Sequence, residues 1–240
     1  MVWSLANDNR SAFQSKTRPT DETKAALRAY RAEQEAQLQD EARKENPDSR
    51  LLDCFCGPLS GWGIPRPPFD LEMVIHMRPR DLPNVVAFSE GWLVNAKIRD
   101  VIEWADPGVH GFWPISLKWK NGADVPEEYW LLNIGARKQT IVEESSKVVF
   151  KRDAKGELFQ VLCVFEKAGF PDSRDPEAKI QKNPLPIFVS KVAIGTSNLW
   201  TERFFGYKAP VAILATDSLF QSLKAADAKV LRPEAYIPEM

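Results

Sequence analysis

The chain has 240 residues, of which 44% are hydrophobic and 27% are charged, and this composition excludes collagen, coiled coil and wholesale disorder. Its 32 Lys and Arg residues almost balance its 33 Asp and Glu residues. A chain without a basic excess is poorly suited to general nucleic-acid binding or to an anionic membrane surface. Because it contains neither a signal-peptide pattern nor a run of 18 apolar residues, we expect a cytoplasmic protein that does not span a membrane.

The cysteines and histidines predict neither a disulfide framework nor a metal site. Cys54 and Cys56 are separated by one residue, and Cys163 lies in an apolar run. A structural zinc site needs four thiolate or imidazole ligands at recognisable spacing. The two histidines, His76 and His110, are isolated from the cysteines and from each other. We therefore expect no metal and no cofactor.

Residues 1–50 are expected to form a charged N-terminal arm, and residues 51–240 a single α+β domain. Helix-forming residues dominate from Asp21 to Asn46, where Thr20 can cap the start of a helix and Pro47 can end it. Large apolar residues are few in this segment. The predicted helix therefore has a thin apolar stripe, and we expect it to pack loosely or against a partner.

Apolar residues mark the strands that follow. Alternation from Phe69 to Arg78 predicts a half-buried strand, and a second alternating strand is predicted from Trp113 to Trp119. The continuous apolar run from Tyr129 to Ile134 is typical of a central strand covered on both faces. Residues 148–152 and 157–165 predict a hairpin, because a Gly-containing turn separates them.

Residues 85–116 and residues 211–237 share one order of features: strand, Ser or Thr, acidic residue, amphipathic helix, strand. Ser89 and Thr216 hold corresponding positions and can each cap a helix, which in the first unit is expected to begin at Trp92. The units are either related halves or coincidental copies of a common arrangement. We predict an α+β fold, with a mixed or antiparallel sheet, flanking helices and the charged N-terminal helix.

Sequence motifs for catalysis are missing, including those of nucleotide cradling, zinc proteolysis and the serine nucleophile elbow. Glu143 and Glu144 are adjacent carboxylates, but neighbours on one strand point in opposite directions, so we expect a solvated or partner-facing loop. His76 should face away from the apolar side of its strand. It is either a surface imidazole beside Glu72 or a proton carrier or partner contact.

The chain contains eight tryptophans. Core-consistent spacing predicts that four of them pack in the interior: Trp92, Trp104, Trp113 and Trp130. Trp62 instead lies in the Gly- and Pro-rich segment 57–68 and has no periodic partner. We therefore expect Trp62 to be an exposed contact residue.

Several segments together resemble a known family. They are VVAFSEGWLVNAKIRDVI, HGFWPISLKW, YWLLNIGARKQTIVEESS, PIFVSK and PVAILATDSLFQSLKAADAKVL, within residues 70–232. This succession resembles the bacterial immunity-protein family numbered eleven in polymorphic toxin systems. The resemblance implies an α+β, cytoplasmic protein without catalytic residues, encoded beside a toxin. Residues 1–50 are expected to lie outside the matched region.

The resemblance implies a non-enzymatic immunity protein that neutralises a cognate toxin protein by direct binding and active-site occlusion. The class of toxin stays open, because the chain lacks the acidic excess expected of an inhibitor of a basic nuclease. Our candidate contact residues are Trp62, His76, Glu143 and Glu144. Two alternatives remain, namely a small hydrolase that uses His76 with Glu72, Glu143 or Glu144, and a sugar- or peptide-binding module that uses Trp62.

Overall fold

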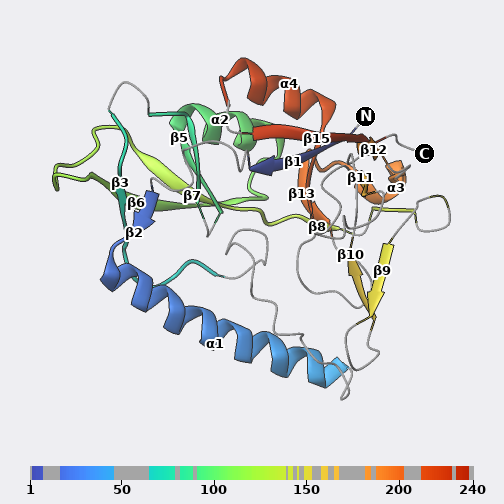
Figure 1. Cartoon of the computed structure of the whole chain (residues 1–240), viewed down its shortest axis with the longest axis horizontal. Helices are drawn as coiled ribbons and strands as arrows, with labels where there is room; N and C mark the ends of the chain where they lie inside the picture. Colours follow the sequence, from blue (N-terminus) through green and yellow to red (C-terminus); the bar gives the residue numbers. More distant parts are fainter. Residues whose placement is uncertain are drawn as a thin grey trace, which may run out of the picture.

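A computed structural model provides the structure of the chain (Figure 1). It describes residues 2–7, 17–45, 65–78, 82–88, 91–138, 140–142, 145, 149–152, 158–161, 165–167, 182–184, 188–202, 212–228 and 231–237. The described strands form a six-stranded sheet, a five-stranded sheet and two two-stranded ribbons. Helices and mixed sheets confirm the predicted α+β fold.

The six-stranded sheet has the strand order β2-β3-β6-β7-β5-β4. Its strands are β2 (Thr17–Pro19), β3 (Leu71–Ile75), β4 (Val85–Phe88), β5 (Gly91–Asn95), β6 (Gly111–Trp119) and β7 (Tyr129–Asn133). β3 runs parallel to β6 and the other pairs are antiparallel, so the sheet is mixed. β7 lies between β5 and β6, which confirms the central strand that its unbroken apolar run predicted.

The five-stranded sheet has the strand order β15-β1-β14-β13-β8. Its strands are β1 (Val2–Asn7), β8 (Arg137–Lys138), β13 (Leu199–Glu202), β14 (Ala212–Thr216) and β15 (Leu231–Ile237). The N-terminal strand β1 is inserted between β14 and β15 and is antiparallel to both. The ribbons pair β9 (Val149–Arg152) with β10 (Leu158–Val161), confirming the predicted hairpin, and β11 (Phe165–Lys167) with β12 (Lys182–Pro184).

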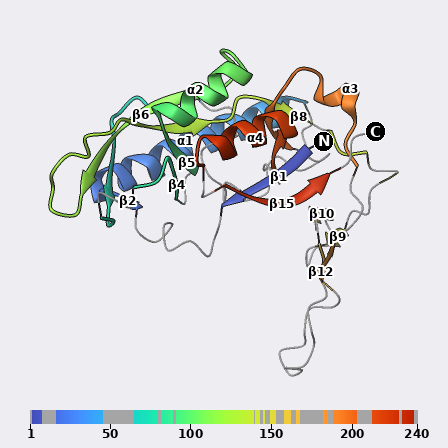
Figure 2. The same cartoon turned by 90° about the horizontal axis from the view of Figure 1, so that it is seen from above.

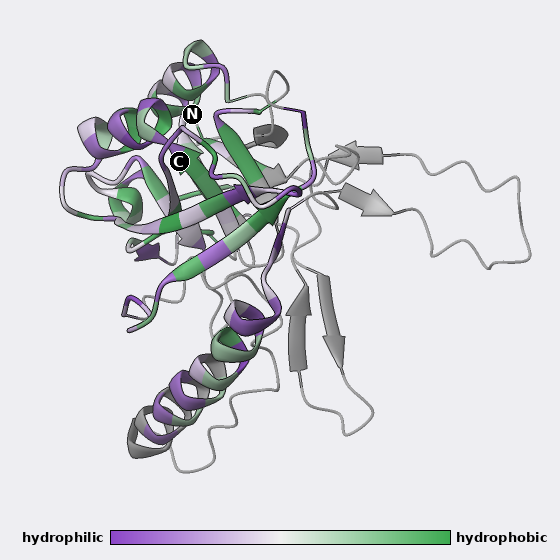
Figure 3. Cartoon of the chain, turned by 90° about the vertical axis from the view of Figure 1, so that its left-hand side faces the viewer, coloured by the Kyte–Doolittle hydropathy of each residue, from purple (hydrophilic) through white to green (hydrophobic). Residues whose placement is uncertain are grey.

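The helices are α1 (Asp21–Glu45), α2 (Ala96–Ala105), α3 (Lys191–Ile194) and α4 (Asp217–Ala225). None of the described helices is long and apolar enough to cross a membrane. α1 begins where predicted, because the Thr23 backbone N–H donates to Thr20 Oγ1 at 3.3 Å. Leu27 and Tyr30 bury its first half against β3, while the rest extends away from the sheets (Figure 3). The boundary at residue 50 stays a prediction, since residues 46–64 lie outside the described part.

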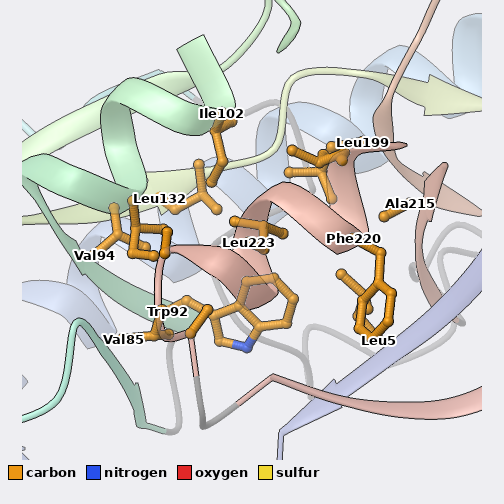
Figure 4. Packing of buried hydrophobic residues seen from close by; sticks show 14 of the residues in the cluster. Leu5, Val85, Trp92, Val94, Ile102, Leu132, Leu199, Ala215, Phe220 and Leu223 are labelled. Atoms are coloured by element: carbon orange, nitrogen blue, oxygen red, sulfur yellow. The ribbon is translucent and has the colours of Figure 1, made fainter. Parts of the chain in front are cut away.

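A shared core joins the two sheets through α2 and α4, which pack against each other (Figures 2 and 4). Trp92 and Leu132 enter this core from the six-stranded sheet, and Leu199 enters it from the five-stranded sheet. The helices contribute Ile102 from α2 and Leu223 from α4. The five side chains are at most 3% exposed, so one buried core connects the two sheets through their helices.

The two strand–helix–strand units have the same topology. β5, α2 and β6 form the first unit, in which the antiparallel strand β7 separates the two parallel strands. β14, α4 and β15 form the second, in which β1 takes the place of β7. Each unit is therefore a split crossover with one inserted strand.

The start of α2 differs from the prediction. Residues 91–95 form strand β5, and the helix begins only at Ala96, where the Asn95 side chain accepts from the Ile98 N–H at 3.3 Å. The predicted helix start at Trp92 was therefore wrong, and Ser89 lies outside the described residues. β5 is apolar on consecutive positions, and periodicity alone cannot distinguish such a strand from a buried helix. The second cap is confirmed, because Thr216 Oγ1 accepts from the Leu219 N–H at 3.4 Å.

Candidate partner-binding site

Trp104 lies on the outer face of α2 and is 81% exposed, so the prediction that it packs in the interior was wrong. α2 faces the core with Ile98 and Ile102, which are 0% and 1% exposed. Each helical residue advances about 100°, so Trp104 lies roughly 200° around the helix from Ile102. The prediction failed because it extended one helical pattern across strand β5. Trp92 and Trp113 are buried as predicted, and Trp130 is half-buried.

A second exposed apolar residue follows Trp104 closely. Val109 is 42% exposed, and the exposed Pro107 lies between them in the turn after α2. We call Trp104, Pro107 and Val109 the α2-end surface. Exposure of a tryptophan side chain to water is unfavourable in free energy. Neighbouring exposed apolar side chains are characteristic of protein contact sites.

The end of α2 is fixed to the five-stranded sheet by a buried carboxylate. Asp106 Oδ1 and Oδ2 accept from the Asn198 backbone N–H at 2.9 and 3.0 Å, and Oδ2 accepts from the Leu199 N–H at 2.8 Å. The Asn198 amide group also donates to Ala105 O at 2.8 Å. These bonds join the residue after α2 to the start of β13. They hold the end of α2, and with it the backbone of Trp104, in place against the five-stranded sheet.

His110 extends this support to the six-stranded sheet. Its Nε2 lies 3.1 Å from Asp106 Oδ2, and its Nδ1 accepts from the Gly135 N–H at 3.3 Å. The second bond assigns the ring proton to Nε2, which donates to Asp106. Burial raises the pKa of Asp106. The hydrogen bonds from His110, Asn198 and Leu199 lower it by more than burial raises it, so the pKa of Asp106 lies below its usual value.

The pair of Asp106 and His110 has the composition of an acid–base pair, but its environment favours a structural role. The two side chains are 3% and 0% exposed. The Asp106 carboxylate is occupied by donors from three residues, so no oxygen is left to receive a proton from a substrate. Sequence reasoning could not identify this role of Asp106, because Asn198 and Leu199 lie more than 90 positions away.

A second buried carboxylate, Glu202, lies at the other end of β13. It accepts from the Thr140 N–H and Oγ1 at 2.6 Å each, and from the Ile141 N–H and Trp200 Nε1 at 3.1 Å each. Burial raises the pKa of Glu202, and the hydrogen bonds from Thr140, Ile141 and Trp200 offset that rise only in part. β13 therefore holds the end of α2 at one end and residues 140–142 at the other.

Of the four predicted contact residues, the described part of the structure includes His76. His76 is exposed and follows β3 directly. Glu72 is not beside it, because four strand residues span about 13 Å, and Glu72 instead pairs with Lys118 at 2.5 Å. Trp62, Glu143 and Glu144 lie outside the described residues. Among the described residues, no group of three or more His, Cys, Asp or Glu side chains could hold a metal ion.

Comparison with known families matches a large part of the sequence. Residues 12–172, about two thirds of the chain, match the Immunity protein family (Imm11). The chain therefore belongs to the Imm11 immunity protein family. No curated protein matches it. The matched region begins within the N-terminal arm, so the expectation that residues 1–50 lie outside it was wrong from residue 12 onward, and it includes the α2-end surface.

Proposed function

We propose that this protein acts in the bacterial cytoplasm as an immunity protein that neutralises a cognate toxin by direct binding and occlusion of the toxin's active site. Membership of the immunity family supports a toxin partner in general. The observation that carries direct binding is the exposed indole of Trp104 on a helix whose end is hydrogen-bonded to β13. A rigid aromatic anchor binds with little loss of conformational entropy.

Occlusion needs a larger contact than the α2-end surface alone. A stable protein complex buries about 1,600 Å² in total, and a few central residues provide most of the binding energy. Trp104 fits the central role, because it is exposed in the free protein and would be desolvated in the complex. The polar face of α2 around it would then form part of the rim.

Co-expression tests this function. We expect the chain to rescue a sensitive bacterium from the product of the adjacent gene, and the two proteins to co-purify. Rescue without a complex would instead indicate an enzyme that reverses the toxin's damage. Absence of rescue would contradict the immunity role.

Trp104→Ala should weaken binding of that toxin by about 2 kcal/mol or more, which is roughly 30-fold in Kd, because a central aromatic anchor is removed. Stability should change by less than about 0.5 kcal/mol, since the side chain is 81% exposed. Calorimetric titration and chemical denaturation measure the two effects. Lys224→Ala on the exposed side of α4 is the control and should change neither. An unchanged Kd for the Trp104 variant would remove this surface from the interface.

The sequence-derived contacts Trp62, His76, Glu143 and Glu144 are a further part of the proposal. Glu143→Lys combined with Glu144→Lys should reduce toxin affinity while the circular dichroism spectrum and the melting temperature stay unchanged. The physical reason is that two charge reversals at an interface rim create like-charge contacts or remove favourable ones. Unchanged affinity would exclude both carboxylates from the interface.

A further inference from the structure

One asparagine joins the start of α4 to the end of α2. Asn198 lies directly before β13, and its backbone oxygen and Oδ1 accept from the Thr216 N–H and Oγ1 at 2.9 Å each. Thr216 is the cap residue of α4. Asn198 Nδ2 donates to Ala105 O at 2.8 Å, and the Asn198 backbone N–H donates to Asp106 at 2.9 Å. The cap of α4 and the last turn of α2 are therefore held by the same residue.

The first unit contains the same arrangement in reverse. Asn84 lies directly before β4, and its backbone oxygen and Oδ1 accept from the Asn95 N–H and Nδ2 at 3.0 and 2.9 Å. Asn84 Nδ2 donates at 2.8 Å to the backbone oxygen of Ala226, the residue that ends α4. In each unit, one asparagine therefore holds the cap of the unit's own helix and the end of the other unit's helix.

β1 lies beside α4 and holds the start of that helix (Figure 1). Val2 pairs with Thr216. Trp3 Nε1 donates at 2.7 Å to Oδ1 of Asp217, in the first turn of α4. The Trp3 ring also packs on Phe220, with the ring centroids 4.7 Å apart. Because a carboxylate acceptor strengthens a hydrogen bond, Trp3 fastens β1 firmly to the first turns of α4.

Two features make β1 separable from the rest of its sheet. The next strand along the chain, β2, belongs to the six-stranded sheet, so only hydrogen bonds and packing hold β1 between β14 and β15. The pairing with β15 is irregular, since the register shifts between Ser4 and Leu5, and Leu5 lies opposite Pro233, which has no N–H to donate. Without β1, β14 and β15 would lie two strand spacings apart, about 10 Å, and could not pair with each other.

We propose that the seating of β1 between β14 and β15 controls the α2-end surface. When β1 is seated, Val2 and Trp3 hold the start of α4. Thr216 then holds Asn198, and Asn198 holds the end of α2. When β1 withdraws, this series of bonds loses its first member, so β1, the start of β13 and the end of α2 open as one unit. This inference rests on the proposed immunity function, because the surface that β1 controls is the one assigned to the toxin.

Hydrogen exchange of backbone amides in the free protein tests the inference. Trp3→Phe removes the indole N–H and keeps an aromatic ring on Phe220. We expect exchange in β1 and at Asn198 and Leu199 to become at least about tenfold faster, by a similar factor, because one opening exposes all of these amides. Trp119→Phe is the matched control, since Trp119 is also half-buried but packs in the other core, at the end of β6 remote from α2. It should leave these rates within about twofold of wild type.

Three results in the free protein would overturn the inference. They are unchanged exchange in β1 of the Trp3 variant, faster exchange confined to β1, and equal acceleration by the control, which would indicate unfolding of the whole chain.

A saturating amount of the adjacent-gene product should slow exchange in β1 of the wild-type protein, since binding and seating favour each other by the same factor. A complex that leaves exchange in β1 unchanged would overturn the control of binding by β1. Absence of a wild-type complex would contradict the immunity function, while exchange in the free protein would still decide whether β1 and the end of α2 open together.

Discussion

Gly135→Ala should destabilise the protein by about 3 kcal/mol or more, because the new methyl group has no space. A Cβ at this position would lie 2.0 Å from the backbone oxygen of Val109. Backbone cannot move aside as the end of a flexible side chain can. The chain around Val109 and His110 would have to shift, which would strain the hydrogen bond from Gly135 to His110.

Urea denaturation of the variant measures this loss, and Gly122→Ala provides the control. Gly122 has a φ of +84° and open space around its Cβ position, so its substitution costs conformational strain without a clash, about 1 kcal/mol. If Gly135→Ala lowered the free energy of unfolding no more than Gly122→Ala does, the backbone at Val109 would be able to move away from the new methyl group without cost. The toxin affinity of a folded Gly135→Ala variant should also fall, because Val109 belongs to the α2-end surface.

Asp106→Asn should reduce the free energy of unfolding at pH 7 by about 3 kcal/mol. The buried carboxylate accepts hydrogen bonds from His110, Asn198 and Leu199, whereas an asparagine amide would turn an NH₂ group toward some of these donors. The loss would loosen α2 from β13. Trp104 should then bind the toxin less tightly even though its own side chain is unchanged.

The pH dependence separates this carboxylate from ordinary surface acids. Because the pKa of Asp106 is lowered in the folded protein, its stabilising contribution is present above the unfolded pKa of about 4 and is lost as the pH falls through the lower folded pKa. The stability difference between wild type and Asp106→Asn should therefore shrink on acidification below about pH 4. Asp100→Asn, at an exposed ion pair, should cost at most about 1 kcal/mol. Parallel stability curves for wild type and Asp106→Asn would contradict this role.

Local sequence patterns predicted the elements whose formation depends on neighbouring residues. Alternation predicted β3 and β6, whose buried residues occupy every second or fourth position. Helix-forming composition and the cap at Thr20 predicted α1 to within one residue of its end. The cap of α4 at Thr216 was predicted for the same reason, since a cap involves residues only three positions apart.

The candidate site was accessible to sequence reasoning only in part. His76 is exposed, although it follows β3 and does not belong to the strand as predicted, but Trp104 could not be separated from the buried tryptophans. The direction in which the Trp104 side chain points depends on where α2 begins. The start of α2 in turn depends on residues 91–95 forming strand β5, which is covered on both faces. An Asn-Ala-Lys-Ile start, with a capping residue at Asn95, is the local signal that could have corrected the prediction.

The amino-acid sequence by itself determined the α+β class, about half of the strands and the N-terminal helix, because these depend on periodicity, capping and local composition. The resemblance to an immunity family came from whole matching segments of the sequence. Only the tertiary structure decided that β1 is inserted between β14 and β15, two strands from the last 30 residues of the chain. It also decided that Asp106 fixes α2 to β13 and that Trp104 faces outward. These features depend on contacts between residues tens to hundreds of positions apart, and no local pattern contains the partner of such a contact.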